Sequence, residues 1–244
     1  MRLFGLIGYP LTHSFSKKYF TEKFEREGLT DCRFENFSFE SIDDFFTLIK
    51  SNPALEGIAV TIPHKRSVLH FLDDVTGIPE DLPACNCIRI MDGKLYGYNT
   101  DYIGFEKSII SLLQPQHQHA LVLGNGGATA AIAFALRRLG ISYEVVSRKL
   151  HGNSSKTYKE LNKVIIERSN VIINTTPLGM YPEIDTCPDI PYQFISAQHL
   201  LYDLTYNPVK TLFLQKGEER GAAIKNGEEM LVLQAEENWR IWNS

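Results

Sequence analysis

The chain has 244 residues, of which 43% are hydrophobic and 22% are charged, and its formal net charge is −4. The composition is that of an ordinary folded protein, and the charge gives no general electrostatic reason to bind nucleic acid or an anionic membrane. No apolar run approaches the roughly 20 residues that a membrane span needs, and the start MRLFGLIGYP is too short for a signal peptide. We therefore expect a cytoplasmic protein of two modest domains.

Four cysteines are few for this length, and no Cys or His pair at zinc-site spacing accompanies them. We expect buried, reduced thiols, with neither a disulfide nor a structural metal. They are Cys32, Cys85, Cys87 and Cys187.

Strand-like and helix-like segments alternate over the first hundred residues. Hydrophobic periodicity predicts strands at 2–8, 32–39 and 57–62, and helices at 14–28, 41–50 and 64–75. Gly28 is expected to end the first helix and Ser41 to cap the second. Strands at 85–91 and 94–100 flank Asp92-Gly93, the favoured pair for a type I′ turn, and so predict an antiparallel hairpin.

A second alternation follows a helix at 100–113 and a polar stretch. Strands are predicted at 120–123, 143–146, 171–176 and 200–206, and helices at 129–139, 154–163, 209–221 and 228–242. Strand–helix repetition of this kind predicts an α/β protein with parallel sheets and right-handed crossovers, twice over.

The stretch LGNGGATAA places glycines between a predicted strand and a predicted helix, where a dinucleotide fold holds its pyrophosphate on helix N–H groups. Gly124 and Gly126 fit the first two glycines of the G-x-G-x-x-G pattern and Gly127 follows them, but Thr129 stands at its sixth position. A glycine-rich turn without a ligand is the alternative. The missing G-K-[ST] ending argues against a phosphate-transferring loop.

The end of the next predicted strand bears on the cofactor. NAD sites usually place an acidic residue about 20 residues beyond the glycines, whereas here Arg148 and Lys149 follow, 24 residues beyond Gly124 for the arginine. A guanidinium suits the 2′-phosphate of NADP. Taken by themselves, the two side chains favour the alternative of solvated loop charges. Because they follow a glycine loop at this distance, we favour NADP.

Three groups in the first half are candidates for chemistry. Lys65 lies near the start of a predicted helix, where the dipole disfavours a cation, and such broken rules gather at functional sites. Taken alone, this position favours the alternative that the side chain simply extends into water. Asp101 would hold a proton-transferring lysine in place, or merely cap the next helix. Ser14 and Ser16 offer two hydroxyls near a helix N-terminus, a cradle for a carboxylate, although Ser14 also reads as a plain cap. His13 is given no role.

Nine stretches in chain order resemble the shikimate dehydrogenase family, over residues 5 to about 242. They are GYPLTHSFS, AVTIPHK, ACNCI, GYNTDYIGF, LGNGGATAA, SRK, INTTPLGM, YDLTYNP and NGEEMLVLQA. The resemblance implies a two-lobed α/β enzyme that reversibly reduces 3-dehydroshikimate to shikimate with NADPH, in the route to chorismate and aromatic amino acids. It implies a substrate-binding and catalytic domain at 1–101 plus 225–244, and a Rossmann-like NADP-binding domain at 102–224.

The resemblance also implies roles for single residues. Lys65 and Asp101 would be catalytic, with Lys65 exchanging the proton at the reacting oxygen. The substrate-binding residues would be Ser14, Ser16, Thr61, Asn86, Asp101, Tyr206 and Gln234. The cofactor-binding residues would be Gly124, Gly126, Gly127, Ala128, Thr129, Arg148, Lys149, Leu204 and Gly227.

Some positions depart from the family pattern. Ala59 stands where an asparagine is usual, Ser147 replaces the asparagine before the arginine, and Gly77 lies where some members carry an acidic residue. A quinate/shikimate dehydrogenase that uses NAD and a metabolite-sensing homologue without turnover are the alternatives; a methylene-tetrahydrofolate dehydrogenase fits the two-serine cradle poorly. We expect a small-molecule substrate, no metal, no nucleic acid or membrane partner, and a monomer or homodimer.

Overall fold

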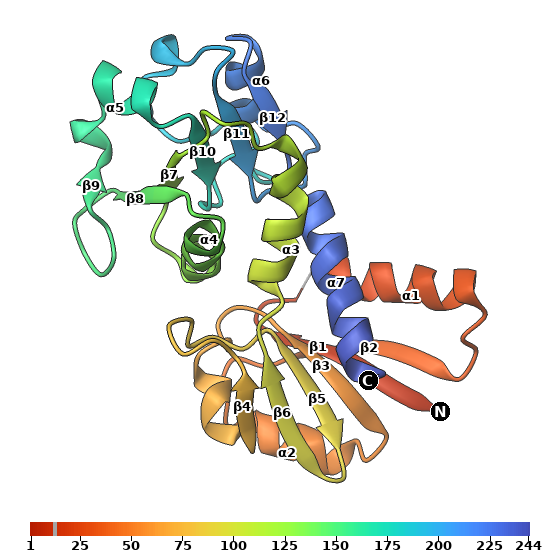
Figure 1. Ribbon diagram of the computed structural model, residues 1–244. Coiled ribbons are helices and arrows are strands. Elements are labelled where there is room, and N and C mark those ends of the chain that lie inside the picture. Colours follow the sequence, from red (N-terminus) through yellow and green to blue (C-terminus); the bar gives the residue numbers. More distant parts are fainter. Residues whose placement is uncertain (12–13) are drawn as a thin grey trace. The chain divides into compact units, whose positions relative to one another are not determined.

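The computed structural model describes residues 1–11 and 14–244 (Figure 1). The chain divides into two compact units. The first unit comprises Met1–Ile103 and Gln234–Ser244, and the second comprises Gly104–Leu233. His13, to which the sequence assigned no role, lies outside the described residues.

The first unit is built on a six-stranded mixed sheet in the order β2-β1-β3-β5-β6-β4. Its strands are β1 (Arg2–Gly8), β2 (Cys32–Ser38), β3 (Leu55–Val60), β4 (Asp74–Gly77), β5 (Cys87–Met91) and β6 (Lys94–Tyr98). β1 pairs in parallel with β2 and β3, whereas β5 runs antiparallel to β3 and β6. The expected hairpin is confirmed: Asp92 and Gly93 have φ of 52° and 74°, as a type I′ turn requires.

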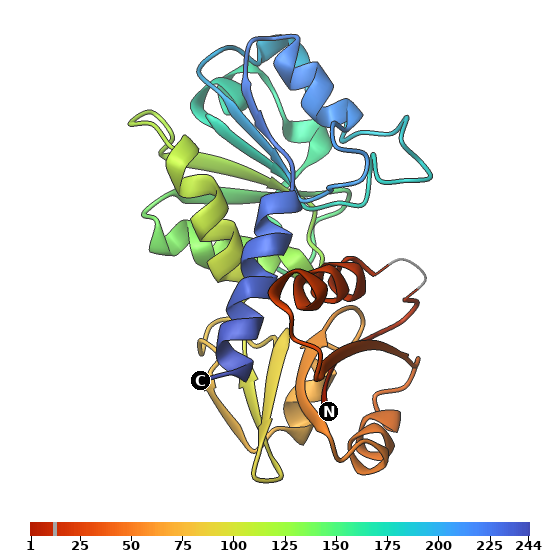
Figure 2. The ribbon, with the colours of Figure 1, turned by 90° about the vertical axis from the view of Figure 1, so that its right-hand side faces the viewer.

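Helices cover both faces of this sheet (Figures 1 and 2). α1 (Phe15–Glu27) and the end of α7 (Glu228–Trp242) pack on one face, where Phe4, Phe20 and Trp242 share an apolar cluster. α2 (Asp44–Ser51) and the 3-10 helix η1 (Ser67–Phe71) cover the other face. The predicted end of α1 is confirmed, because Gly28 caps it with φ of 67°.

Two predictions in this unit are wrong. The helix expected at 64–75 is a turn, then η1, then β4. Side chains of this segment bond backbone groups instead: Asp73 Oδ2 accepts from the Leu95 N–H at 2.8 Å, and Asp74 Oδ1 accepts from the Thr76 N–H at 2.7 Å. Ser41 does not cap α2, which starts at Asp44; its hydroxyl oxygen accepts from the Asp43 N–H in the turn before the helix.

The second unit contains a six-stranded parallel sheet in the order β12-β11-β10-β7-β8-β9. Its strands are β7 (His119–Leu123), β8 (Ser142–Ser147), β9 (Lys156–Thr157), β10 (Val171–Asn174), β11 (Leu200–Asp203) and β12 (Ala223–Lys225). The chain moves outward from β7 through β8 and then, on the other side, from β10 through β11. This is the doubly wound order, with its switch point between β7 and β10.

Helices also cover both faces of the second sheet. α5 (Lys163–Arg168) and α6 (Leu212–Glu218) pack against one face of this sheet. Their side chains share an apolar cluster with Leu121 and Leu201 of the strands, and Phe213 of α6 is part of it. α4 (Gly127–Arg138) buries Ile132, Leu136 and three of its alanines. α3 (Asp101–Ile109), followed by η2 (Ile110–Leu112), places Phe105 against Tyr202. No helix in the described part of the chain has the length and apolar character to cross a membrane.

The helix expected at 154–163 is also wrong. These residues form β9 and the 3-10 turn η3 (Tyr158–Glu160), and the true helix, α5, begins only at Lys163. Thr157 and Glu160 start the 3-10 turn, because the Glu160 carboxylate accepts from the Thr157 N–H at 2.6 Å. Asn162 then caps α5, since its side-chain oxygen accepts from the Ile165 N–H at 3.1 Å. A third short 3-10 turn, η4 (Tyr192–Phe194), precedes β11.

The four cysteines are free thiols. Cys85 and Cys87 are buried in the first unit, and burial raises the pKa of the Cys85 thiol to about 12. Cys32 and Cys187 are only half-buried, contrary to the expectation that all four are buried.

Candidate active site

Sheet topology places the candidate polar site residues of the first unit at one edge of the sheet, the edge formed by the carboxyl ends of β1 and β3. β1 and β3 are parallel, so the segments after both strands, with Ser14 and Thr61, leave at the same edge. Because β5 runs antiparallel to β3, Asn86 lies at the start of β5 beside the end of β3, and the Val60 N–H donates to its carbonyl at 2.8 Å. Asp101 follows β6, which returns to that edge.

Lys65 and Asp101 form a close ion pair at this edge. Lys65 Nζ lies 2.6 Å from Asp101 Oδ2, and only 21% and 9% of the two side chains are exposed. Lys65 lies in the turn before η1, and its carbonyl accepts from the Cys85 N–H at 2.7 Å. Asp101 is the first residue of α3, where a carboxylate is favoured by the helix dipole. A lysine held against a carboxylate in a mostly buried setting is equipped to exchange a proton.

Asn86 connects this pair to the C-terminal helix. Its buried Nδ2 lies 2.9 Å from Asp101 Oδ1, 2.9 Å from Thr100 Oγ1 and 3.3 Å from Gln234 Oε1. An amide nitrogen has two hydrogens for these three acceptors. The longest contact, to Gln234, is the weakest, so the Gln234 side chain is the member of the set that can most readily turn toward a ligand.

Thr100 and Asn238 extend the network, and the sequence reasoning missed both. Thr100 Oγ1 donates to Asn238 Oδ1 at 2.6 Å, and the Thr100 N–H donates to Asn86 Oδ1 at 2.6 Å. Both side chains are buried. A signal was present for Asn238, because it lies four residues after Gln234 and therefore on the same face of a helix.

The two serines occupy the start of α1. Ser14 caps the helix, as its alternative interpretation held, because its hydroxyl oxygen accepts from the Lys17 N–H at 3.1 Å; its own hydrogen remains to donate. Ser16 lies in the first turn and Thr61 just after β3, both half-buried. None of the hydrogen bonds within residues 1–11 and 14–244 joins these three hydroxyls to the Lys65–Asp101 pair.

The glycine loop of the second unit lies at the switch point of the parallel sheet. Gly124 follows β7 with φ of 110°, a conformation that side chains rarely adopt. Gly126 and Gly127 are exposed at the start of α4, and a Cβ on either would meet open space. A helix N-terminus with open space beside its first residues fits a pyrophosphate. Ala128, next in α4, is half-buried.

Thr129 shapes this loop from inside. Its buried hydroxyl oxygen accepts from the Gly126 N–H at 3.1 Å, and it also lies 3.1 Å from the Gly124 carbonyl and 2.9 Å from Thr175 Oγ1. Thr175 follows β10, so this bond links the segment after β7 to the segment after β10 at the switch point. Thr129 therefore holds the loop in place rather than facing outward.

Arg148 and Lys149 are exposed at the end of β8, the strand next to β7. Neither forms an ion pair with any residue in the described part of the chain. Arg148 is near Tyr158, whose pKa burial raises to about 12 against a smaller lowering by the guanidinium. Asn125 Nδ2 donates to the His151 carbonyl at 2.6 Å, which ties the glycine loop to the loop of the two cations. Two cations without an ion pair, beside a helix N-terminus with open space at its first residues, fit a dinucleotide with a 2′-phosphate.

Leu204 and Gly227 lie against each other, just beyond β11 and β12 respectively. The Gly227 N–H donates to the Thr205 carbonyl at 3.1 Å, and a Cβ on Gly227 would lie 2.1 Å from the Leu204 oxygen. Only glycine permits so close a backbone approach. Burial raises the pKa of Tyr206.

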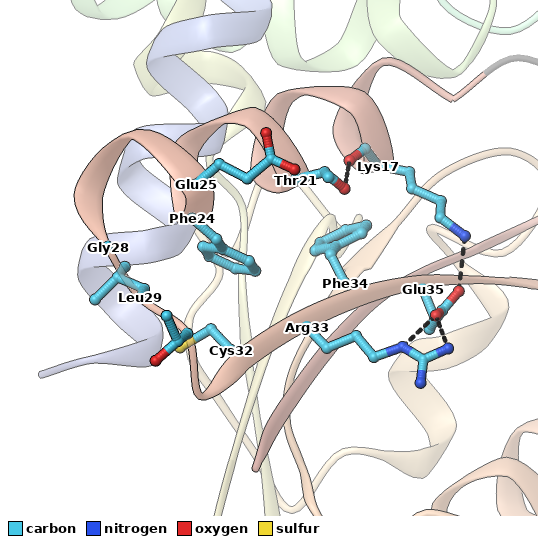
Figure 3. Close-up of a pocket in the computed structure, with 11 residues that line it drawn as sticks. Lys17, Thr21, Phe24, Glu25, Gly28, Leu29, Cys32, Arg33, Phe34 and Glu35 are labelled. Atoms are coloured by element: carbon cyan, nitrogen blue, oxygen red, sulfur yellow. Dashed lines mark hydrogen bonds and ion pairs between the residues drawn. The ribbon is translucent and has the colours of Figure 1, made fainter.

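A surface pocket between α1 and β2 is separate from these residues (Figure 3). Its floor is apolar, with Phe24, Leu29 and Phe34, and no predicted site residue lines it. At its rim Lys17 Nζ lies 2.7 Å from Glu35, so the charges there are already paired with one another. We assign the pocket no chemistry.

Comparison with known proteins gives the family. Residues 6–88 match the family described as the shikimate dehydrogenase substrate binding domain. The shikimate dehydrogenase (NADP(+)) of Clostridium beijerinckii is 37% identical over 254 residues, which cover 99% of this chain and 92% of that protein.

Solved structures agree. Shikimate 5-dehydrogenase from Thermus thermophilus, in complex with NADP(H) and shikimate, has a TM-score of 0.87 and 27% identity, over 99% of this chain and 93% of that one. Quinate dehydrogenase from Corynebacterium glutamicum, in complex with NAD, has the same TM-score and coverage at 22% identity, a likeness in fold alone. With 37% identity over nearly its whole length to a named member, the chain belongs to the shikimate dehydrogenase family.

Proposed function

We propose that this chain is an NADP-dependent shikimate dehydrogenase, which reversibly reduces 3-dehydroshikimate to shikimate in the biosynthesis of chorismate and aromatic amino acids. The observation that carries the proposal is the Lys65–Asp101 pair, with 2.6 Å between Nζ and Oδ2 in a mostly buried setting. A metabolite sensor needs to bind its ligand but not to move a proton. The alternative without turnover would therefore have no use for this pair.

NADPH, when bound, supplies the hydride. Lys65 gives the proton to the carbonyl oxygen of the substrate, and its charge stabilises the negative charge that develops there. Asp101 holds the ammonium by the ion pair, and Asn86 holds Asp101 through its other oxygen, at 2.9 Å. In the direction of shikimate oxidation, Lys65 takes the proton back.

The remaining polar groups recognise a small polyhydroxy carboxylate. In this proposal Ser14, Ser16 and Tyr206 bind the carboxylate, and Thr61, Asn86, Asp101 and Gln234 bind the ring hydroxyls. The weak 3.3 Å contact between Asn86 and Gln234 supports a role in which the Gln234 amide turns to the substrate.

The second unit holds NADP in this proposal. The N-terminus of α4 at Gly126 and Gly127 receives the pyrophosphate, with Gly124 and Ala128 shaping the turn, and Arg148 and Lys149 bind the 2′-phosphate. Leu204 and Gly227 lie near the nicotinamide. The first unit is then the substrate-binding and catalytic domain, with predicted limits of 1–101 plus 225–244, and the second is the NADP-binding domain, with predicted limits of 102–224. We also propose that the protein works in the cytoplasm, as a monomer or homodimer, without a nucleic-acid partner.

Initial-rate spectrophotometry with both substrates and both cofactors tests the proposal. We expect turnover to be largely confined to shikimate with NADP+. Comparable turnover of quinate with NAD+ would make the chain a quinate/shikimate dehydrogenase instead. Binding of shikimate without any turnover would identify a sensor.

A further inference from the structure

Asp203 is a fully buried carboxylate that the proposed reaction does not use. It ends β11, and 0% of its surface is exposed. Burial raises its pKa, against opposing hydrogen bonds from Thr211, Thr205 and Asn174. Among the ion pairs of residues 1–11 and 14–244, none includes it, so hydrogen bonds alone offset the cost of burying the group.

The partners of Asp203 come from three different elements. Oδ1 accepts from Asn174 Nδ2 at 3.1 Å and from the Thr205 N–H at 3.0 Å, and Oδ2 accepts from Thr211 Oγ1 at 2.6 Å. Asn174 ends β10, Thr205 lies just beyond β11, and Thr211 caps α6. One carboxylate therefore joins the end of a neighbouring strand, the segment after its own strand and the start of the next helix.

The segment 204–206 is held from more than one side. The Thr205 N–H is fixed by Asp203, and the Thr205 carbonyl by the Gly227 N–H at 3.1 Å. The Leu204 N–H donates to the Asn174 carbonyl at 3.0 Å, which continues the β10–β11 ladder by one residue. Removing Asp203 would free the middle of the segment and leave the Thr205 N–H buried without its partner.

Strand order indicates which part of the cofactor this segment faces. The glycine loop follows β7, and the two cations proposed for the 2′-phosphate follow β8, on one side of β7. β10 and β11 lie on the other side, and all four strands are parallel, so their ends share one edge. A dinucleotide with its pyrophosphate on the loop and its adenosine toward β8 extends its nicotinamide half toward the ends of β10 and β11.

We propose that Asp203 is a positioning residue, which fixes the segment 204–206 against the nicotinamide half of the cofactor. This inference rests on the proposed function, in its assignment of NADP to the second unit. Asp203 does not touch the cofactor. It acts through Leu204 and Thr205, and its carboxylate suits the task because two oxygens receive three donors at once.

The test compares two ligands that share only the adenosine half. NADP+ and 2′,5′-ADP both carry the 2′-phosphate, but 2′,5′-ADP lacks the nicotinamide. Their dissociation constants are measured by calorimetry for the wild type, for Asp203→Ala and Asp203→Asn, and for Asp189→Ala, which removes an exposed carboxylate from the same unit. Calorimetry requires no turnover, so the result is readable even if shikimate is not the substrate.

We expect Asp203→Ala to weaken NADP+ by about tenfold or more and 2′,5′-ADP by less than about twofold. Asp203→Asn should retain most of the NADP+ affinity that Asp203→Ala loses. Its side-chain oxygen still accepts from Asn174 and Thr205, and the Thr211 hydroxyl reverses to accept from its amide. Asp189→Ala should change neither constant. Equal losses for both ligands, no loss for either, or an Asn variant as impaired as the Ala variant would each overturn the proposal.

A second variant keeps the test decisive if Asp203→Ala does not fold. Thr211→Val removes the donor to Oδ2 and preserves the shape of the side chain, and we expect a smaller loss confined to NADP+. An equal effect on both ligands would overturn the proposal here as well. A wild type that binds neither ligand would instead refute the assignment of NADP to this unit, and the positioning role with it.

Discussion

Lys65 Nζ and Asp101 Oδ2 lie 2.6 Å apart although the residues are 36 positions apart in the sequence. The turn after β3 supplies the lysine, and the first residue of α3 supplies the carboxylate. The hairpin of β5 and β6 returns the chain between them and brings Asp101 back to the edge where Lys65 leaves the sheet.

Replacing Lys65 by alanine should abolish proton transfer while leaving the binding groups in place. We expect kcat to fall by about 10²- to 10⁴-fold, the usual contribution of a positioned acid or base, with shikimate and NADP+ affinities changed little. Initial rates and calorimetric titrations separate the two effects. Lys94→Ala, an exposed lysine of the same unit, is the control. A Lys65→Ala enzyme within a few fold of wild type would remove Lys65 from the mechanism.

Replacing Arg148 by alanine should affect NADP far more than NAD. A lost hydrogen bond to a charged group costs about 1.5–3 kcal/mol, which is roughly a tenfold to hundredfold weaker NADP+ complex. NAD lacks the 2′-phosphate and should be bound nearly as before. Dissociation constants for both cofactors check this, with Lys159→Ala as an exposed basic control in the same unit. Equal losses for the two cofactors would refute the 2′-phosphate role.

Replacing the buried Asn238 by alanine should loosen the network around Asp101. The Thr100 hydroxyl loses its 2.6 Å acceptor and keeps only Asn86 Oδ1, at 3.2 Å. We expect the free energy of unfolding to fall by about 1–3 kcal/mol, as for a buried polar group that loses its partner. Urea denaturation measures this. Asn238→Asp, which retains an acceptor oxygen, should lose less; an aspartate variant as unstable as the alanine variant would contradict the role of the acceptor.

The stability of the protein should depend on pH through Asp203. Burial raises the pKa of this carboxyl above its ordinary value of 3.8, so the folded state binds the proton more tightly than the unfolded state. The resulting contribution to stability is fully present below the unfolded pKa and is lost as the pH rises through the folded pKa.

Asp203→Asn does not titrate, so it should gain stability relative to wild type as the pH rises from about 4 to about 7. Urea denaturation of both proteins over that range gives the difference directly. A difference that stays constant with pH would show that the carboxyl titrates alike in the folded and unfolded chains, and one that shrinks toward neutrality would show that folding lowers its pKa.

Local signals in the sequence predict much of this fold. The Asp92-Gly93 pair predicts the hairpin, Gly28 predicts the end of α1, and the helix expected at 228–242 forms with those limits. The helix expected at 64–75 fails because the Asp73 carboxylate accepts from Leu95, a partner 22 positions away. Periodicity within a short window contains no information about such a partner.

The same limit governs the candidate site. The glycine loop stands out in the sequence because its residues are adjacent, and Lys65 and Asp101 stand out through the family resemblance. Asp203 and Asn238 do not stand out, because their significance lies in burial and in remote donors and acceptors. A single polar residue at the end of an apolar strand looks the same whether it is buried or solvated.

The place of the C-terminal segment in the fold determines which unit can finish folding first during synthesis. Gln234–Ser244 belongs to the unit that begins at Met1, and the Trp242 indole packs over Gly57 and donates to the Ile88 carbonyl at 3.0 Å. The second unit is complete once Leu233 has left the ribosome. The first unit, although its sheet is translated earlier, lacks the helical segment that packs beside α1 on one face until Gln234–Ser244 has also been translated. Nascent chains therefore leave part of the apolar face of the first sheet uncovered while the second unit is translated, and the second unit is the first that can finish folding.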